Sequence, residues 1–276
     1  MKSNFAFLNS HFPVLANFGE LAEKYLYSDS NSCLMKLGMI GETIVNLCFT
    51  YDRIPLPQDN TAAVRINSLF REGMVTRDLK EVLHALRISR NKATHENYAS
   101  VEDGKTLLQM AYSLCEWFMQ TYGDWNYQNQ PFVMPSETLE PVSVNQQSEQ
   151  AQETQWIEEA ERAAAAAPTI EKEVRKKQSA KAASQRVKSE AETRYLIDEQ
   201  LRKVGWEADT EQLRYSKGTR PAKGRNIAIA EWPTDSTVGN RGYVDYALFV
   251  AASNPKTIYR FWCRTALNTA FRWWQR

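Results

Sequence analysis

The fold class is decided by the stretch SEAETRYLIDEQLRKVGW, residues 189–206, together with IAIAEW at 227–232 and YVDYALFV at 243–250. The first stretch predicts a helix, because Ser189 and Glu192 have the spacing of a capping box and a glycine ends the pattern. The inner stripe of this helix is predicted to consist of Leu196, Ile197, Gln200, Leu201 and Val204. The other two stretches are rich in aromatic and β-branched residues and predict strands. A helix followed by two strands indicates the beginning of an α/β core.

Upstream of this core, residues 1–135 predict a helical bundle of four or five helices. One apolar stripe consists of Cys33, Leu37, Ile40, Ile44 and Leu47. Further stripes follow at 79–86 and 107–118, the second of them behind a capping pair of Ser100 and Asp103. No alternating strand pattern competes with these helices.

Between the two regions, residues 136–188 have a different composition, rich in Gln, Glu, Ala and Lys. Pro168 interrupts the pattern, and apolar heptad positions are too sparse for a coiled coil. This segment predicts a charged helical linker in two pieces, with partial disorder. The chain as a whole is therefore expected to be α+β, with a third region at 189–276.

Composition narrows the class of protein. The 276 residues carry 34 Lys and Arg against 33 Asp and Glu, a net charge of +1, which argues against a uniformly basic nucleic-acid coat protein. No apolar run approaches the ~18 residues of a membrane span, and the N-terminus lacks the pattern of a secretory signal. We therefore expect a cytoplasmic chain without a membrane partner, whose four cysteines are free thiols.

Asp245 lies inside an otherwise apolar strand, where a carboxylate is costly to bury unless it is paired or binds a cation. Hard divalent cations such as Mg²⁺ prefer oxygen ligands, and a strand aspartate beside the helix glutamate Glu192 would supply two of them. Such a pair would begin a metal-dependent phosphodiester hydrolase site. The other interpretation stays open, with Asp245 on the solvent face of an edge strand and Glu192 as a helix cap.

The order of these segments adds a resemblance. The helix ETRYLIDEQLRKVGW (192–206), followed by LRYSKG, AIAEWP and GYVDYALFV, resembles the nuclease domain of the R (restriction) subunit of type I restriction endonucleases, type IA branch, and the resemblance covers about residues 1–250. It implies a PD-(D/E)xK-type core with Asp245 as the first metal-binding acid and Glu192 as the helix glutamate. It also implies Mg²⁺ as cofactor and ATP-dependent DNA cleavage, in a complex with methyltransferase and specificity subunits.

The sequence departs from this family pattern after the strand of Asp245. The family places E-x-K on the next strand, whereas residues 251–276 contain no acid, and Asn254 stands two residues before Lys256. This tail carries five Lys and Arg residues, so residues 1–250 have a net charge of +1 minus 5, or −4. We expect an aberrant tail from about 251, in an R subunit whose reading frame is lost just after Val250 and whose core is incomplete and catalytically impaired. A divergent C-terminal segment is the alternative.

The resemblance also implies an ATPase motor that this sequence does not show. No G-x-x-x-x-G-K-[ST] pattern occurs in it, so ATP is expected only in the full-length family.

Two further sets of residues are candidate sites. Arg90, Asn91 and His95 resemble the R-x(4–6)-H motif of HEPN domains, which are helical bundles that include metal-independent ribonucleases. A HEPN-like ribonuclease or a docking module is therefore the alternative function, with a polar cluster between helices as the purely structural interpretation. Four basic residues in a Gly- and Pro-rich loop are predicted to contact DNA phosphates, unless they are simply solvated: Lys217, Arg220, Lys223 and Arg225.

Overall fold

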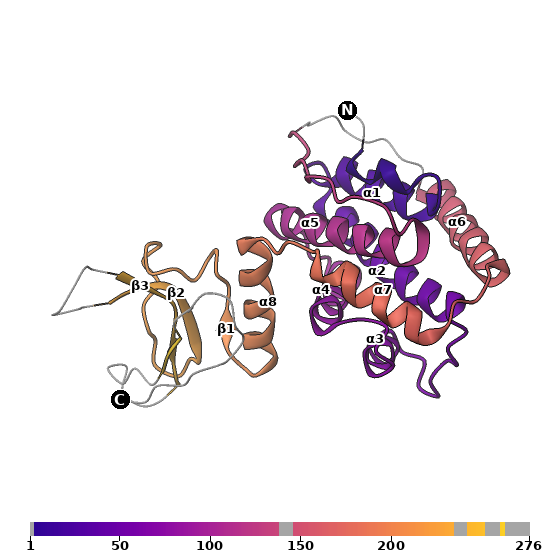
Figure 1. Ribbon diagram of the computed structural model, residues 1–276. Helices are drawn as coiled ribbons and strands as arrows, with labels where there is room; N and C mark the ends of the chain where they lie inside the picture. The colour runs from indigo at the N-terminus through magenta and orange to yellow at the C-terminus, as the bar shows by residue number, and fades with distance from the viewer. Residues whose placement is uncertain (1–2, 138–145, 235–241, 252–259, 263–276) are drawn as a thin grey trace. The chain divides into compact units, whose positions relative to one another are not determined.

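The computed structural model describes residues 3–137, 146–234, 242–251 and 260–262. It divides into two compact units, Met1–Ser189 and Glu190–Arg276. Figure 1 shows a first unit made of helices and a second that combines one helix with a small sheet. The predicted α+β content is confirmed at this level.

Five α-helices in the first unit form the bundle predicted for residues 1–135. They are α1 (Pro13–Tyr25), α2 (Ser30–Tyr51), α3 (Ala62–Arg71), α4 (Arg77–Glu96) and α5 (Val101–Phe118), with the 3₁₀ turn η1 (Asn4–Leu8) before them and the π-helical turn η2 (Met119–Gly123) after them. Helices α2 and α5 each begin at a side-chain cap, and the one at Ser100 was predicted. The Asp29 carboxylate accepts a hydrogen bond from the amide of Ser32, and the Ser100 hydroxyl accepts one from the amide of Asp103.

Helix α2 lies at the centre of the bundle core, because it packs against α1, α3, α4, α5 and α6 (Gln146–Ala166). Its predicted stripe of Cys33, Leu37, Ile40, Ile44 and Leu47 is fully buried. Among the described residues, α2 alone has the length and apolar composition of a membrane-spanning helix, and 72% of that stretch is buried within the protein. A helix buried in a protein core also meets this criterion of length and apolar composition.

The cysteines of the described chain serve packing. Cys33, Cys48 and Cys115 are buried free thiols, as the sequence predicts, and burial raises the pKa of Cys48 to about 12. Thiols of such high pKa are not nucleophilic at neutral pH. Cys263 lies outside the described residues.

The segment expected to be a linker contributes two helices, α6 and α7 (Lys172–Ser184), which pack within the first unit. The buried Lys36 ammonium of α2 pairs with Glu149 of α6 at 2.6 Å and also with Glu153. The indole N–H of Trp117 in α5 donates to the Ser179 carbonyl of α7 at 3.2 Å. Most of the described part of 136–188 is therefore helical, and its two helices are held to the bundle rather than spaced from it.

A buried ion pair holds α7 most firmly. The Arg175 guanidinium donates from Nε to the Asp52 carboxylate at 3.0 Å, and both side chains are 3% exposed. Asp52 also accepts a hydrogen bond from the Tyr122 hydroxyl at 2.6 Å, and the guanidinium stacks 4.1 Å from the Tyr122 ring centre. A charge this deep requires such partners.

The second unit contains α8 (Glu190–Lys203) and a sheet of four strands in the order β1 (Glu207–Ala208), β2 (Ile227–Thr234), β3 (Gly242–Phe249) and β4 (Arg260–Trp262). β1 pairs parallel with β2, and the other two pairs are antiparallel. The helix and the strands β2 and β3 were predicted. The sheet continues beyond the strand of Asp245, because β4 pairs with β3 and covers its edge.

Helix α8 packs with Ile197 and Leu201 against the sheet face formed by Ala208, Ala228, Ala230, Tyr246 and Leu248. The predicted inner stripe is wrong in part, because Val204 is 72% exposed. The buried positions of α8 are instead Glu192, Tyr195, Asp198 and Glu199. Polar partners make this burial tolerable, so the helix presents acids to the protein interior.

Candidate functional site

The candidate site is organised around Asp245 on β3. The register pairs Ala230 with Tyr246 and Trp232 with Val244, which places Asp245 directly across from Glu231 of β2. Glu231 has a φ of 51°, a left-handed conformation that is rare for a non-glycine residue, and the regular pairing is interrupted there. Asp245 is half-buried and makes no hydrogen bond or ion pair with another described residue. Two carboxylates therefore stand on neighbouring strands.

Two arginines compensate the charge of Glu231. Arg194 of α8 lies 3.3 Å from its carboxylate, and Arg214, in the loop after β1, lies at the same distance. Arg194 follows Glu192 by two residues on α8, and Glu192 is 2% exposed. The structure thus connects the helix of Glu192 to the strand position opposite Asp245. Sequence reasoning missed Glu231 and its two arginines, although Glu231 interrupts an apolar run just as Asp245 does.

A second buried acid on α8 serves to hold the helix to the sheet. The Asp198 carboxylate accepts hydrogen bonds from the Thr210 amide at 2.7 Å, the Thr210 hydroxyl at 2.9 Å and the Tyr246 hydroxyl at 3.2 Å. Burial raises the pKa of Asp198. Tyr246 follows Asp245 directly, so this network fixes the strand on which the candidate acid lies.

The described residues do not complete a metal site. In 3–137, 146–234, 242–251 and 260–262, no three His, Cys, Asp or Glu side chains are grouped so that they could hold one ion. Asp245 and Glu192 would provide two carboxylates, and Mg²⁺ is commonly held by one or two carboxylates together with substrate phosphates and water. Their residue types therefore suit Mg²⁺, but the described residues bring no third acid, histidine or cysteine to them.

The four basic residues predicted to contact DNA are all exposed, but two of them have protein partners. Arg225 donates from Nε to the Glu207 carboxylate at 2.9 Å, which neutralises its charge. Arg220 donates to the carbonyl oxygens of Tyr215 and Thr219 and stacks 3.7 Å from the Tyr215 ring centre. Lys217 and Lys223 pair with no carboxylate of the described chain. The charges of Lys217, Lys223 and Arg220 are therefore not neutralised by a carboxylate of the described residues, although Arg220 is held against Tyr215.

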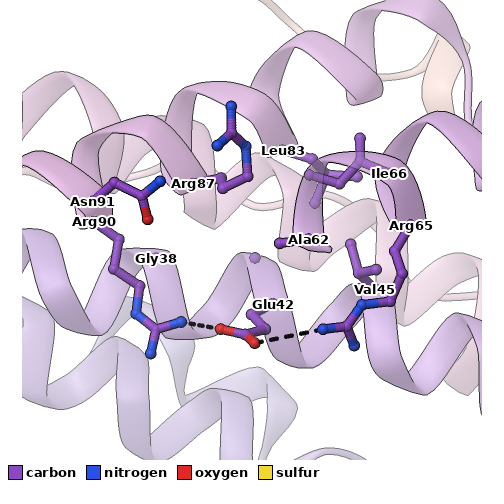
Figure 2. Close-up of a pocket in the computed structure, with 11 residues that line it drawn as sticks. Gly38, Glu42, Val45, Ala62, Arg65, Ile66, Leu83, Arg87, Arg90 and Asn91 are labelled. Atoms are coloured by element: carbon purple, nitrogen blue, oxygen red, sulfur yellow. Dashed lines mark hydrogen bonds and ion pairs between the residues drawn. The ribbon is translucent and has the colours of Figure 1, made fainter. Parts of the chain in front are cut away.

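The residues of the HEPN-like motif all lie on α4, near its C-terminal end. Arg90 is paired with the Glu42 carboxylate of α2, and Figure 2 shows its guanidinium directed toward that carboxylate. His95 is exposed and follows Arg90 by five residues, which is about 140° around a helix. The structure therefore puts Arg90 in contact with α2 and His95 on a different side of α4.

Comparison with known proteins gives matches in both units. Residues 207–257 match the family described as the second domain of the type I restriction enzyme EcoKI endonuclease subunit, and residues 20–154 match a domain of unknown function (DUF4145). The EcoKI endonuclease subunit of Escherichia coli (strain K12) is 32% identical over 304 residues, an alignment that covers 90% of this chain. The chain spans 26% of the length of that relative. No solved structure matches the chain.

Proposed function

Because the chain belongs to the family of type I restriction endonuclease subunits, we propose that it works in a type I restriction system as the N-terminal part of an R subunit. The activity implied for such a system is ATP- and Mg²⁺-dependent cleavage of foreign DNA. The partners implied are DNA and the methyltransferase and specificity subunits. The similarity over 90% of the chain supports this proposal.

We assign the nuclease role within that system to the second unit, as a PD-(D/E)xK-type core with Asp245 and Glu192 as its acids. The observation that carries the assignment is the half-buried Asp245, which has no partner among the described residues and lies opposite Glu231. The Glu231 carboxylate contacts Arg194 of α8, which follows Glu192 by two residues. Burying an acid in a strand without a partner costs free energy. Such residues therefore tend to occur at functional sites.

By itself the chain is proposed to cleave DNA poorly or not at all, because the acids of its described residues do not complete a metal site and residues 251–276 contain no acid. The test incubates the purified chain with supercoiled plasmid and Mg²⁺, alongside Asp245→Asn and the exposed-acid control Glu207→Gln. We expect no nicking above background by any of the three proteins. Nicking by the wild type and by Glu207→Gln that Asp245→Asn abolishes would contradict the inactive state and would support Asp245 as catalytic.

The place of the chain in a larger assembly is tested separately. Tagged methyltransferase and specificity subunits of a type I system from the same source should retain the full chain on a column. A chain that elutes freely at low and at physiological salt would argue against the assembly proposal, whatever the plasmid assay shows.

Contact with DNA is proposed for Lys217 and Lys223, whose charges are unneutralised. Each Lys→Ala change should weaken binding to DNA of any sequence and lower the slope of log K against log salt by about 0.9. Arg225→Ala is the matched control, because Glu207 already neutralises that charge. If the wild type and all of these variants show equal slopes, the loop does not contact DNA.

A HEPN-like ribonuclease is the second candidate function, because Arg90 and His95 lie on one helix of a helical bundle. Incubation with single-stranded RNA in EDTA tests it. Cleavage that His95→Ala abolishes would establish this function, whereas intact RNA would leave the first unit as a binding or docking module.

A further inference from the structure

A small cavity with a mostly apolar wall and several charged side chains lies between three helices of the first unit. Its walls come from Gly38, Gly41, Glu42 and Val45 of α2, Ala62, Arg65 and Ile66 of α3, and Leu83, Arg87, Arg90 and Asn91 of α4. Its volume is ≈ 50 Å³. Since one water needs about 10–15 Å³ by this measure, the cavity has room for several water molecules or one compact ion. The side chains around it are drawn in Figure 2.

The charged side chains of the cavity wall are mainly positive. Three arginines and one glutamate line it, which gives a net charge of three minus one, or +2. The carboxylate of Glu42 is shared, since it pairs with Arg90 and lies 3.9 Å from Arg65. Arg87 points away from Glu42 (Figure 2), and no carboxylate of the described chain is paired with it. Like charges three residues apart, as in Arg87 and Arg90, destabilise a helix unless they are compensated.

The hydrogen-bonding capacity of these arginines is also incompletely used. The Nε atoms of Arg65 and Arg87 are buried and have no acceptor within the described chain. Buried donors normally have an acceptor, and a guanidinium presents five donors in a planar fork that matches tetrahedral oxyanions. Asn91 follows Arg87 by one helical turn and adds an amide to the same wall.

A close contact shows how Arg90 reaches this wall. A Cβ atom built on Gly38 would lie 2.3 Å from the Cβ of Arg90, so only glycine lets the arginine stem lie against α2 at this point. The arrangement is specific to the packing of α2 and α4.

We propose that this cavity binds a phosphate group, either as inorganic phosphate or as the terminal phosphate of a nucleotide. Arg87, Arg90 and Arg65 would supply the positive charge and Asn91 a neutral donor. The volume accommodates the phosphate group and leaves no room for a base, so a nucleotide would extend out of the cavity. His95 has no part in this site.

Calorimetric titration of the full chain tests the proposal, with inorganic phosphate, AMP, ATP and adenosine as probes at constant ionic strength. Phosphate-bearing probes should bind, and adenosine should not. Comparable affinities for inorganic phosphate and nucleotides would identify the phosphate alone as the ligand. Tighter binding of AMP or ATP would identify a nucleotide. A chain that binds none of the phosphate compounds overturns the proposal.

Variants then locate the site. Arg87→Gln removes an arginine without a carboxylate partner, so it should fold normally and lose at least about tenfold in affinity, as expected for a charged hydrogen bond. Arg71→Gln, an exposed arginine of α3 outside the cavity, is the matched control. Glu42→Gln should bind phosphate several-fold more tightly, because it removes the competing carboxylate. Equal affinities for Arg87→Gln and Arg71→Gln, or weaker binding by a folded Glu42→Gln, would place the anion elsewhere.

Discussion

At the scale of single residues, Asp198 has the clearest energetic role. Its carboxylate is buried and accepts three hydrogen bonds, two from Thr210 and one from Tyr246. Asp198→Ala would remove the acceptor of the Thr210 amide and leave the Thr210 and Tyr246 hydroxyls with each other as partners, so we expect the free energy of unfolding of the second unit to fall by about 1–3 kcal/mol. Urea unfolding followed by the fluorescence of Trp206 and Trp232 measures this. Lys203→Ala, an exposed change on the same helix, should stay within about 0.5 kcal/mol.

The pH dependence of the same residue has a definite sign. Burial raises the pKa of Asp198, so the folded state binds its proton more tightly than the unfolded state does. The contribution of Asp198 to stability is therefore fully present below its ordinary pKa of about 4 and declines as pH rises through the raised pKa. The stability difference between wild type and Asp198→Ala should shrink from pH ~4 towards neutrality. A difference that grows with pH would show that the hydrogen bonds outweigh burial.

At the scale of elements, the docking of α7 depends on a buried ion pair. Arg175→Met would leave Asp52 buried with only the Tyr122 hydroxyl as partner, and breaking such a pair typically costs about 3–5 kcal/mol. We expect a corresponding loss in the urea midpoint of the first unit. The double change Arg175→Met with Asp52→Asn should recover part of the loss, because no charge is then stranded. Lys176→Ala serves as the surface control, since its pair with Glu173 is exposed.

At the scale of the whole molecule, the division between Ser189 and Glu190 predicts two units that fold separately. A fragment of residues 1–189 should keep its helical circular dichroism and unfold cooperatively at the midpoint that it has in the full chain. Asp198→Ala in the full chain should leave that midpoint unchanged. An unfolded fragment, or a midpoint that moves with Asp198→Ala, would show that the first unit depends on the second.

The sequence by itself determined the helices of the bundle, the strands around Ala228 and Asp245, and the family of the chain. These depend on periodicity, caps and β-branched runs, which are local properties. It pointed to Asp245 because an acid inside an apolar strand is visible without a structure.

Only the tertiary structure decided which surfaces meet. Pairing of Lys36 and Arg175 with acids distant in sequence brings α6 and α7 onto the bundle, and a polar composition alone suggests a linker. The buried face of α8 follows from partners such as Thr210 and Tyr246, which apolar periodicity does not register. Strand register places Glu231 opposite Asp245, and helix packing assembles an arginine-lined cavity from three helices. Each of these depends on contacts between residues far apart in the chain, and no local pattern specifies such contacts.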